Sequence, residues 1–546
     1  MHSAFPDAFP HWAALGRFGF EVGAIALLIS LRWLFSGNMG SANEVDVLPL
    51  ARQAADPTWI PQDWYLNQPA GYRLLFAAIF GSMASAWGFL ATSLVGRLLC
   101  YLLIGSGLVA LRHTLKLNLL PLLLAVGLFF DLDQYTFWRQ GIAAGEWLAQ
   151  ALETKVLAYG FVLWGISFLL SGRYLGMAVM LGIATSFHTL VGGWAFVSAM
   201  LWLLLKRQLP LRPWPRNLGL IALYGVASAF SVQPVLGQLL APKVDSPIST
   251  SYAYVFLRLP HHLNPFTWGT REWVLRLAIC LVLLGLSYAM ARRLPQSDPA
   301  TGRAARLGLA EFALVSLISF GLGLAIAPFD HDGKFLQYYP FRFGDVMLPL
   351  SATLLAACSL QQWCSSKQAS QRLKIAIALL LALLCSLQLS ITAVRVSGLQ
   401  SFPGKTQGFD PDLKELTAWV RSNTPQSAIV ITSPFDWVGF TWFAERGTIA
   451  KFKLLPQTAQ GIAEWLQRLD DLSGNQTFWA DLDPRKNNSG IIRDRLRTGY
   501  RKLTTSQAVA LMGKYQASYM VTVAPQRLEL PIAFQNERYR LYRRPD

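Results

Sequence analysis

The chain has 546 residues, of which 53% are hydrophobic and only 14% are charged. A soluble globular chain carries about 25% charged residues, so this composition excludes an ordinary soluble protein and predicts that most of the length lies in lipid. The net charge of +17 does not indicate nucleic-acid binding, because excess lysine and arginine in a membrane protein usually belongs to its cytoplasmic loops.

A membrane-spanning helix needs about 20 mostly apolar residues, and eleven apolar segments follow one another before residue 400. They are 18–35, 89–111, 117–130, 156–170, 174–187, 190–205, 218–239, 273–291, 309–328, 343–360 and 373–394. Three of them, 117–130, 156–170 and 174–187, are short for a full span, so we expect them to be tilted, broken or partly re-entrant. The segment 72–87 is rich in Gly, Ser and Met, and we interpret it as an interfacial helix.

Lysine and arginine determine the expected orientation. Clusters of basic residues fall on alternate loops, at 112–116, 173, 206–216, 292–306 and 367–374, and the positive-inside rule places these loops in the cytoplasm. The sequence therefore predicts an integral protein of the inner or plasma membrane with a cytoplasmic N-terminus. The loop 37–71, the loop 131–155 and the C-terminal part then lie on the external, periplasmic side.

Residues 401–546 contain no membrane-length apolar run. Helical spacing recurs at 412–422, 462–469 and 505–514, and strand patterns occur at 428–432, 519–523 and 539–543. Alternating helices and strands are typical of an α/β domain. We therefore expect two domains: an α-helical polytopic membrane domain, 1–400, and a small exported soluble α/β domain, 401–546.

The first external loop, 37–71, carries the principal catalytic candidates. Glu44 and Asp46 are separated by one residue, so in an extended loop both carboxylates project to the same side. One is then available as a general base and the other can orient it. On a helix they would point about 200° apart, so this interpretation needs a non-helical backbone. The alternative is a solvated acidic loop. Asp56 and Asp63 stand beside prolines and are typical of turn and cap residues.

The second external loop, 131–155, combines charged and aromatic side chains. Its charged residues are Asp131, Asp133, Arg139, Glu146, Glu153 and Lys155. The interleaved tyrosine and tryptophans form either an interfacial belt or a platform for sugar rings.

Two basic residues at the ends of apolar runs are candidate phosphate ligands. His188 lies between two apolar runs and precedes Gly192-Gly193, a pattern that favours a helix break lining a cavity. Three roles are open for His188: it binds a phosphate, orients a carboxylate, or forms a hydrogen bond within the bundle. Arg342 begins a run, and its planar guanidinium matches phosphate oxygens. The alternative is an ion pair with Asp345 on the same helix face.

Asp330, His331 and Asp332 are candidate ligands for a divalent metal ion, although three consecutive residues rarely all face one point. No other cofactor is indicated.

Three segments carry a family resemblance: NEVDVLPLARQAADPTWIPQDWYLN (43–67), the stretch 153–194 with SFHTLVGGW, and YPFRFGDVMLPL (339–350). Together with about eleven spans, two acidic external loops and an exported α/β domain, they resemble the glycosyltransferase-C superfamily, membrane enzymes that use polyprenyl-phosphate-linked sugars. The resemblance implies that Asp46 or Glu44 is the catalytic base. It also implies that the family's second-loop acids correspond to Asp131, Asp133 or Glu153. The chain lacks the Asp-Glu pair of protein O-mannosyltransferases and the W-W-D-Y-G motif of oligosaccharyltransferases.

The predicted function is an inverting transfer of a sugar from a polyprenyl-phosphate donor, on the external face, to a glycan, lipid or protein acceptor. The candidate phosphate ligands are Arg342, Lys155, His188 and Arg139. The aromatic residues expected to cover the sugar are Trp59, Trp64 and Tyr65. The alternatives are a lipid or sugar transporter or flippase, and a non-catalytic envelope assembly protein.

Overall fold

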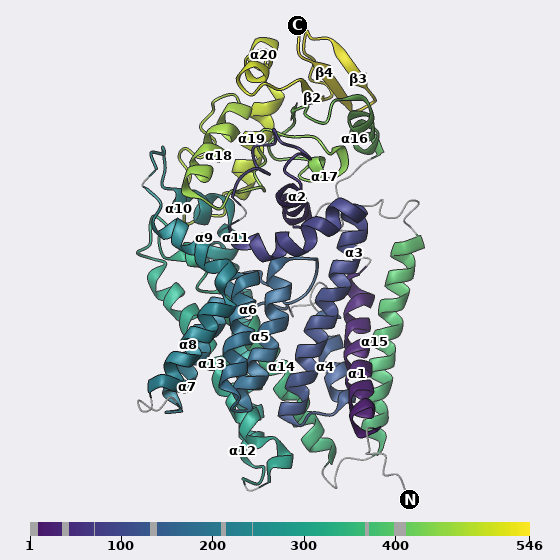
Figure 1. Cartoon of the computed structure of the whole chain (residues 1–546), viewed down its shortest axis with the longest axis vertical. Helices are drawn as coiled ribbons and strands as arrows, with labels where there is room; N and C mark the ends of the chain where they lie inside the picture. Colours follow the sequence, from purple (N-terminus) through teal and green to yellow (C-terminus); the bar gives the residue numbers. More distant parts are fainter. Residues whose placement is uncertain are drawn as a thin grey trace, which may run out of the picture.

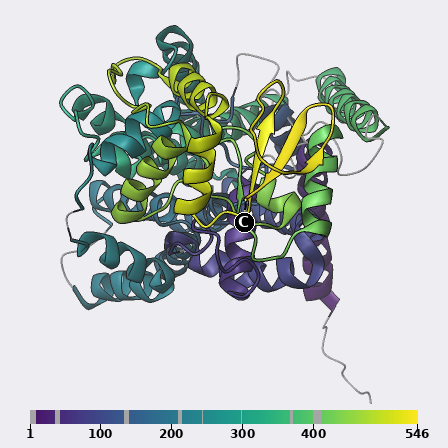
Figure 2. The same cartoon turned by 90° about the horizontal axis from the view of Figure 1, so that it is seen from above.

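The computed structural model describes residues 9–34, 43–69, 71–131, 139–208, 214–242, 244–296, 298–365, 371–397 and 411–545. These residues form two layers (Figure 1). A bundle of long helices makes up the lower layer, with the first described residues at its far end. The C-terminal residues form a smaller layer that lies over the opposite end of the bundle, as the view from above shows (Figure 2).

The helices of the bundle overlap all eleven apolar segments that the sequence singles out. They are α1 (Phe9–Trp33), α3 (Leu74–Leu115), α4 (Leu119–Asp131), α5 (Thr154–Leu170), α6 (Tyr174–Phe187), α7 (Thr189–Leu205), α8 (Trp214–Ala227), α9 (Ala229–Leu239), α12 (Thr270–Arg292), α13 (Arg303–Ile326), α14 (Arg342–Ser365) and α15 (Gln371–Ser397). Of the described helices, four are long and apolar enough to cross a membrane alone, or five if a bent pair counts as one span. The protein is thus an integral membrane protein, and its exact number of spans stays a prediction.

The bent pair corrects one predicted span. Segment 218–239 is not one straight helix, because α8 and α9 meet at an angle of 82°. The break lies at Ser228, whose backbone leaves the helical region between the two helices. Such an interruption occurs at membrane depth only where neighbouring protein satisfies the freed backbone groups.

Helix α3 has two arms. The first corresponds to the predicted interfacial segment 72–87 and the second to the predicted span 89–111. They meet at Gly88, whose φ of 74° is readily available only to glycine. The first arm runs across the top of the bundle and the second descends into it (Figure 1). The interfacial position expected for 72–87 stays a prediction.

The first predicted external loop contains a helix, α2 (Glu44–Ala55). The expectation of an extended backbone at Glu44 and Asp46 is therefore wrong. Both acids lie in the first helical turn, where the helix dipole favours negative charge, and the buried side chains of this helix include Val45, Leu48 and Leu50.

The turn after α2 contains the two other acids of this loop. The Asp56 carboxylate accepts hydrogen bonds from the amide and the hydroxyl of Thr58, at 3.1 and 2.6 Å. The Asp63 carboxylate accepts one from the amide of Leu66 at 2.8 Å. Both acids therefore have the turn and cap roles that their prolines indicate.

The C-terminal part is an α/β unit with a four-stranded sheet of order β1-β2-β4-β3. Its elements are α16 (Pro411–Asn423), β1 (Val430–Ile431), α17 (Phe440–Ala444), α18 (Ala459–Leu472), α19 (Ser489–Arg501), α20 (Thr505–Lys514), β2 (Tyr519–Val523), β3 (Ile532–Gln535) and β4 (Tyr539–Arg543). Strand β1 pairs parallel to β2, and the other pairs are antiparallel. The three predicted strands and three predicted helices are present, whereas α17, α19 and β3 were not anticipated.

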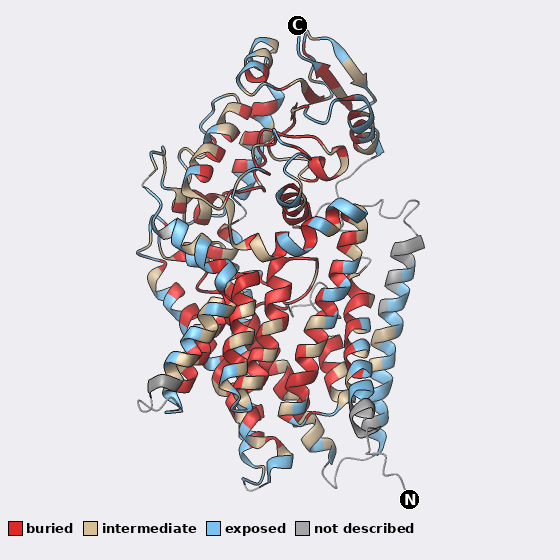
Figure 3. Ribbon diagram, in the orientation of Figure 1, coloured by how far each residue is buried: buried red, intermediate tan, exposed pale blue. Residues whose placement is uncertain are grey.

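Polar contacts join the two layers through the segment that contains α2. Arg52 forms an ion pair with Glu445 at 3.1 Å, and Asp63 accepts a hydrogen bond from the amide of Thr448 at 2.9 Å. Gln426 donates to the carbonyl of Trp59 at 2.7 Å. We call this contact region the seam. Buried residues continue from the bundle interior into it (Figure 3).

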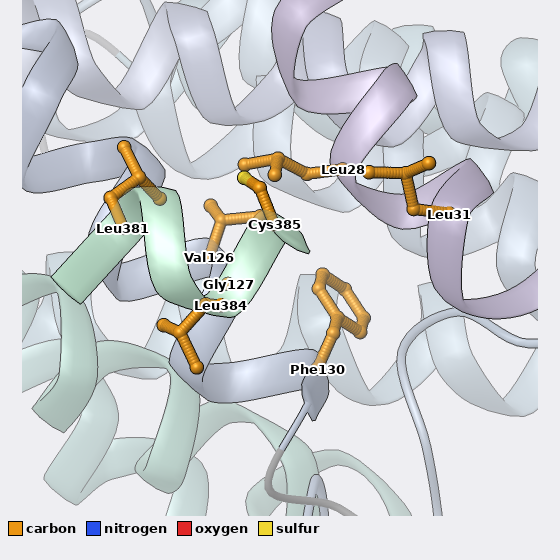
Figure 4. Close-up of a pocket in the computed structure, with 8 residues that line it drawn as sticks. All are labelled: Leu28, Leu31, Val126, Gly127, Phe130, Leu381, Leu384 and Cys385. Carbon is orange, nitrogen blue, oxygen red and sulfur yellow. The ribbon is translucent and has the colours of Figure 1, made fainter. Parts of the chain in front are cut away.

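A small apolar crevice lies among α1, α4 and α15 (Figure 4). Its lining consists of Leu28, Leu31, Val126, Gly127, Phe130, Leu381, Leu384 and Cys385. Because none of these side chains is charged, the crevice suits hydrocarbon and carries no acid–base chemistry.

Candidate active site

Asp46 occupies the centre of a hydrogen-bonded group at the seam. Both of its oxygens accept from Arg73, at 2.9 and 2.7 Å, and one also accepts from the hydroxyl of Tyr65. The side chains of Asp46 and Arg73 are only 14% and 9% exposed. A bidentate arginine fixes the plane of a carboxylate, so Asp46 has one defined orientation.

Glu44, the other predicted base, is enclosed in the protein. Its carboxylate binds Arg97 at 2.7 and 2.8 Å and accepts from the hydroxyl of Ser93 and the amide of Leu152. The side chains of Glu44 and Arg97 are 0% exposed. All of these bonds are internal, so Glu44 neutralises Arg97 inside the protein, and its assistance to Asp46 stays a prediction.

A second charged group surrounds Glu146, in the loop before α5. Arg342 donates to Glu146 at 2.9 Å, and Lys155 and His262 approach the same carboxylate at 3.4 and 3.6 Å. Arg342 also contacts Nε2 of His188 at 3.0 Å. Burial acts to raise the pKa of Glu146, but Arg342, Lys155 and His262 outweigh it and hold the pKa well below its usual range.

Arg342 and Asp345 do not form the ion pair that their spacing allows. Asp345 instead accepts hydrogen bonds from the amides of Ala143, Ala144 and Glu146, at 2.6, 3.0 and 3.2 Å. It thereby holds the loop that presents the Glu146 carboxylate to Arg342.

Tyr72 and Arg258 connect the two charged groups. The ring of Tyr72, next to Arg73, lies 4.8 Å from the ring of His188. Arg258 interacts electrostatically with Asp46 and with Tyr339, the aromatic ring over which Arg342 lies at 3.7 Å. The Asp46 group and the Glu146 group are therefore parts of one site, which we call the seam site.

Arg258 and Lys453 belong to this site but were not found from the sequence. Arg258 ends the π-helix η2 (Ala253–Arg258), a rare conformation that is frequent at functional sites. Lys453 comes from the C-terminal part and interacts electrostatically with Asp46, Glu153 and Arg258. The sequence offers only a faint signal for Arg258, its place just before the His261-His262 pair.

Several predicted residues have other surroundings. Arg139 is exposed and interacts electrostatically with Arg276 of α12. Trp59 donates to Glu445 at 3.1 Å and Trp64 lies under Arg468, which places both rings against the C-terminal part. Of the three predicted aromatic residues, Tyr65 alone contacts Asp46.

The Asp131 side chain and Asp133 lie outside the described residues.

The candidate metal ligands are also separated by their local structure. Asp330 accepts from the amides of Lys334, Phe335 and Leu336, and Asp332 pairs with Lys334 at 3.0 Å. Within the described ranges, no three His, Cys, Asp or Glu side chains are grouped so as to hold a metal ion.

Comparison with known proteins gives a family match over part of the chain and distant likenesses to solved structures. Residues 411–472 match a family described as Domain of unknown function (DUF6798), and no curated protein matches. The fold is similar to crystal structures of ArnT from Cupriavidus metallidurans, in the apo state and bound to undecaprenyl phosphate. Each has 12% identity and 98% coverage of both chains, with TM-scores of 0.47 and 0.40. Both TM-scores lie below 0.5, so these likenesses say nothing about the chemistry of the seam site.

Proposed function

We propose that this protein is a membrane glycosyltransferase that transfers a sugar from a polyprenyl-phosphate-linked donor to an acceptor hydroxyl at the seam site. The observation that supports this most strongly is that the charged side chains of the seam site include one more cation than acids. The cations of the site are Arg73, Arg258, Arg342, Lys155 and Lys453, and its acids are Asp46, Glu146, Glu153 and Asp345.

The charge balance fits the chemistry of a lipid phosphate leaving group. Unbalanced charge in a buried place is unfavourable unless a ligand compensates it. A phosphodiester donor carries one negative charge, and its phosphate gains a second when the bond to the sugar breaks. Preorganised cations aimed at developing charge usually give the largest catalytic contribution, so surplus arginine and lysine at this point favour phosphate release.

In the proposed reaction, the acceptor oxygen attacks the anomeric carbon while the bond from that carbon to the phosphate oxygen breaks. The hydroxyl proton goes to Asp46, and the bonding pair leaves with the phosphate. Arg73 and Tyr65 orient Asp46, and Arg258 and Arg342 are the arginine candidates for the phosphate. Attack from the side opposite the leaving group inverts the anomeric centre.

The two alternatives have less support. Transporter sites usually lie near the bilayer midplane at the interface of paired, interrupted helices, whereas the charges of the seam site gather at the end of the bundle that faces the C-terminal part. A non-catalytic assembly protein has no need of a fixed carboxylate beside surplus cations.

The first prediction concerns Asp46. In cells lacking the endogenous gene, wild-type protein should restore the envelope glycan and glycolipid profile, and Asp46→Asn should reduce the restored product by roughly 100-fold or more, as for a lost general base. Asp56→Asn is the matched control, because asparagine can accept the same turn hydrogen bonds from Thr58. An Asp46→Asn profile equal to that of wild type would contradict the assignment.

A further inference from the structure

We propose that the C-terminal part completes the active site, with Lys453 as a ligand for the phosphate of the lipid-linked substrate. This inference rests on the proposed function and adds to it. The membrane layer supplies Asp46, Arg73 and Arg258, but Lys453 reaches the site only because the C-terminal part lies over α2.

The backbone of Lys453 is held against the membrane layer by an arginine of the site. Arg258 donates from Nε and Nη2 to the carbonyl oxygen of Lys453, at 3.2 and 2.9 Å. Phe452, the preceding residue, lies under the Arg258 guanidinium at 5.8 Å. These contacts hold the backbone of residue 453 in the seam, next to η2.

The side chain of Lys453 has acids of two different elements as neighbours. It interacts with Asp46 of α2 and with Glu153, just before α5. One Glu153 oxygen is buried without a hydrogen-bond partner, although Lys155 lies 3.8 Å from the other oxygen. Burial and the charge of Arg258 lower the pKa of Lys453, while Asp46 and Glu153 act in the opposite direction.

A comparison with Lys451 shows that this position is unusual. The Nζ of Lys451 donates to the hydroxyl of Thr432 and to the carbonyls of Ser433 and Asp436, at 2.6, 2.7 and 2.9 Å. Lys451 therefore stabilises a loop inside the C-terminal part. Lys453, two residues later, instead interacts electrostatically with Asp46 and Glu153 of the membrane layer. A lysine binds phosphate as a compact point charge, and binding would place the phosphate between the two layers.

Undecaprenyl phosphate in nanodiscs is a suitable binding probe. We expect Lys453→Met to weaken its binding at least tenfold, and Lys453→Arg to retain most of it because the charge remains. Lys502→Met, which changes an exposed lysine of the same layer, should bind as wild type does. Limited proteolysis of each variant reports whether the C-terminal part remains docked.

A second measurement uses the unmodified protein and so does not depend on the folding of a variant. Mass spectrometry after amine acetylation should show that undecaprenyl phosphate protects Lys453 and leaves Lys502 unchanged. Wild-type binding without protection of Lys453, or equal binding by a docked Lys453→Met variant, would overturn the role of Lys453 alone. Absence of binding by wild type would overturn the proposed function as well.

Discussion

Glu44 and Asp46 show how two acids separated by one residue acquire opposite roles. The helix turns them to different sides, so Glu44 faces α3 and the interior whereas Asp46 faces Arg73 and the seam. Glu44 makes four hydrogen bonds in a fully buried position. Its role is to neutralise Arg97 inside the bundle, and removing its charge should affect folding more than chemistry.

The second prediction concerns this ion pair. Glu44→Gln removes the negative charge and leaves Arg97 buried without compensation, which typically costs about 3–5 kcal/mol. The melting temperature in detergent should fall clearly, while the fraction that remains folded should keep its transfer activity. Asp46→Asn should show the reverse, lost activity with a small change in melting temperature.

The double variant Glu44→Leu/Arg97→Met is the control for buried charge. Replacing both partners by apolar side chains of similar size often restores stability, so this variant should melt above Glu44→Gln. A Glu44→Gln protein that is as stable as wild type but inactive would contradict the packing role and would indicate that Glu44 takes part in catalysis.

The seam site was predictable in part from single residues. His188 and Arg342 stand out because charged or polar groups interrupt apolar runs, and they do lie together, at 3.0 Å. Lys453 and Arg258 gave no comparable signal, since lysine and arginine outside apolar runs are ordinary surface residues. Their role arises from contacts between parts of the chain almost 200 residues apart, which no local pattern encodes.

At the scale of elements, the apolar runs predicted where the helices of the bundle lie in the sequence but not where they bend. The length of an apolar segment predicts a helix, but the 82° break between α8 and α9 depends on packing. The helix α2 was missed because polar residues and Pro49 lie within it. Its stability comes from its packing against α3 rather than from a membrane-length pattern.

The third prediction tests that packing. Gly81 of α3 has no side chain where α2 approaches, and a Cβ atom there would lie 2.3 Å from the carbonyl oxygen of Ala51 and 2.9 Å from the Cβ of Ala55. Gly81→Ala must therefore push α2 away. Overpacking costs about 1–3 kcal/mol, which exceeds the gain of up to about 1 kcal/mol in helix propensity. We expect a lower melting temperature and reduced activity, because α2 carries Asp46.

Gly285→Ala in α12 is the matched control, since an added Cβ there meets nothing within 4 Å. It should melt at or slightly above the wild-type temperature. Equal melting temperatures for Gly81→Ala and Gly285→Ala would show that α2 is free to shift without cost.

For the whole molecule, the seam joins stability to function. The carboxylate of Glu445 accepts from Arg52 and Trp59 of the membrane layer and pairs with Arg421 of its own layer. The same segment of the membrane layer carries Asp46 and Asp63. Docking of the C-terminal part and the geometry of the seam site therefore depend on one set of contacts.

The final prediction uses the buried carboxylate of Asp63. Burial raises its pKa from 3.8 to about 6, against the opposing effect of hydrogen bonds from the amides of Leu66 and Thr448. Between about pH 4 and pH 6 the folded protein thus retains a proton that the unfolded chain has released. Stability from this group is present at low pH and declines as the pH rises through this window.

Asp63→Asn has no proton to lose there, so its stability relative to wild type should increase from pH 4 to pH 7. By the linkage between pKa and free energy, the change is about 3 kcal/mol at most. Melting temperatures of both proteins in detergent across this range measure the effect, with proteolysis to confirm that it arises at the seam. Parallel melting profiles would mean that the Asp63 carboxylate is charged throughout and that its amide hydrogen bonds outweigh the cost of burial.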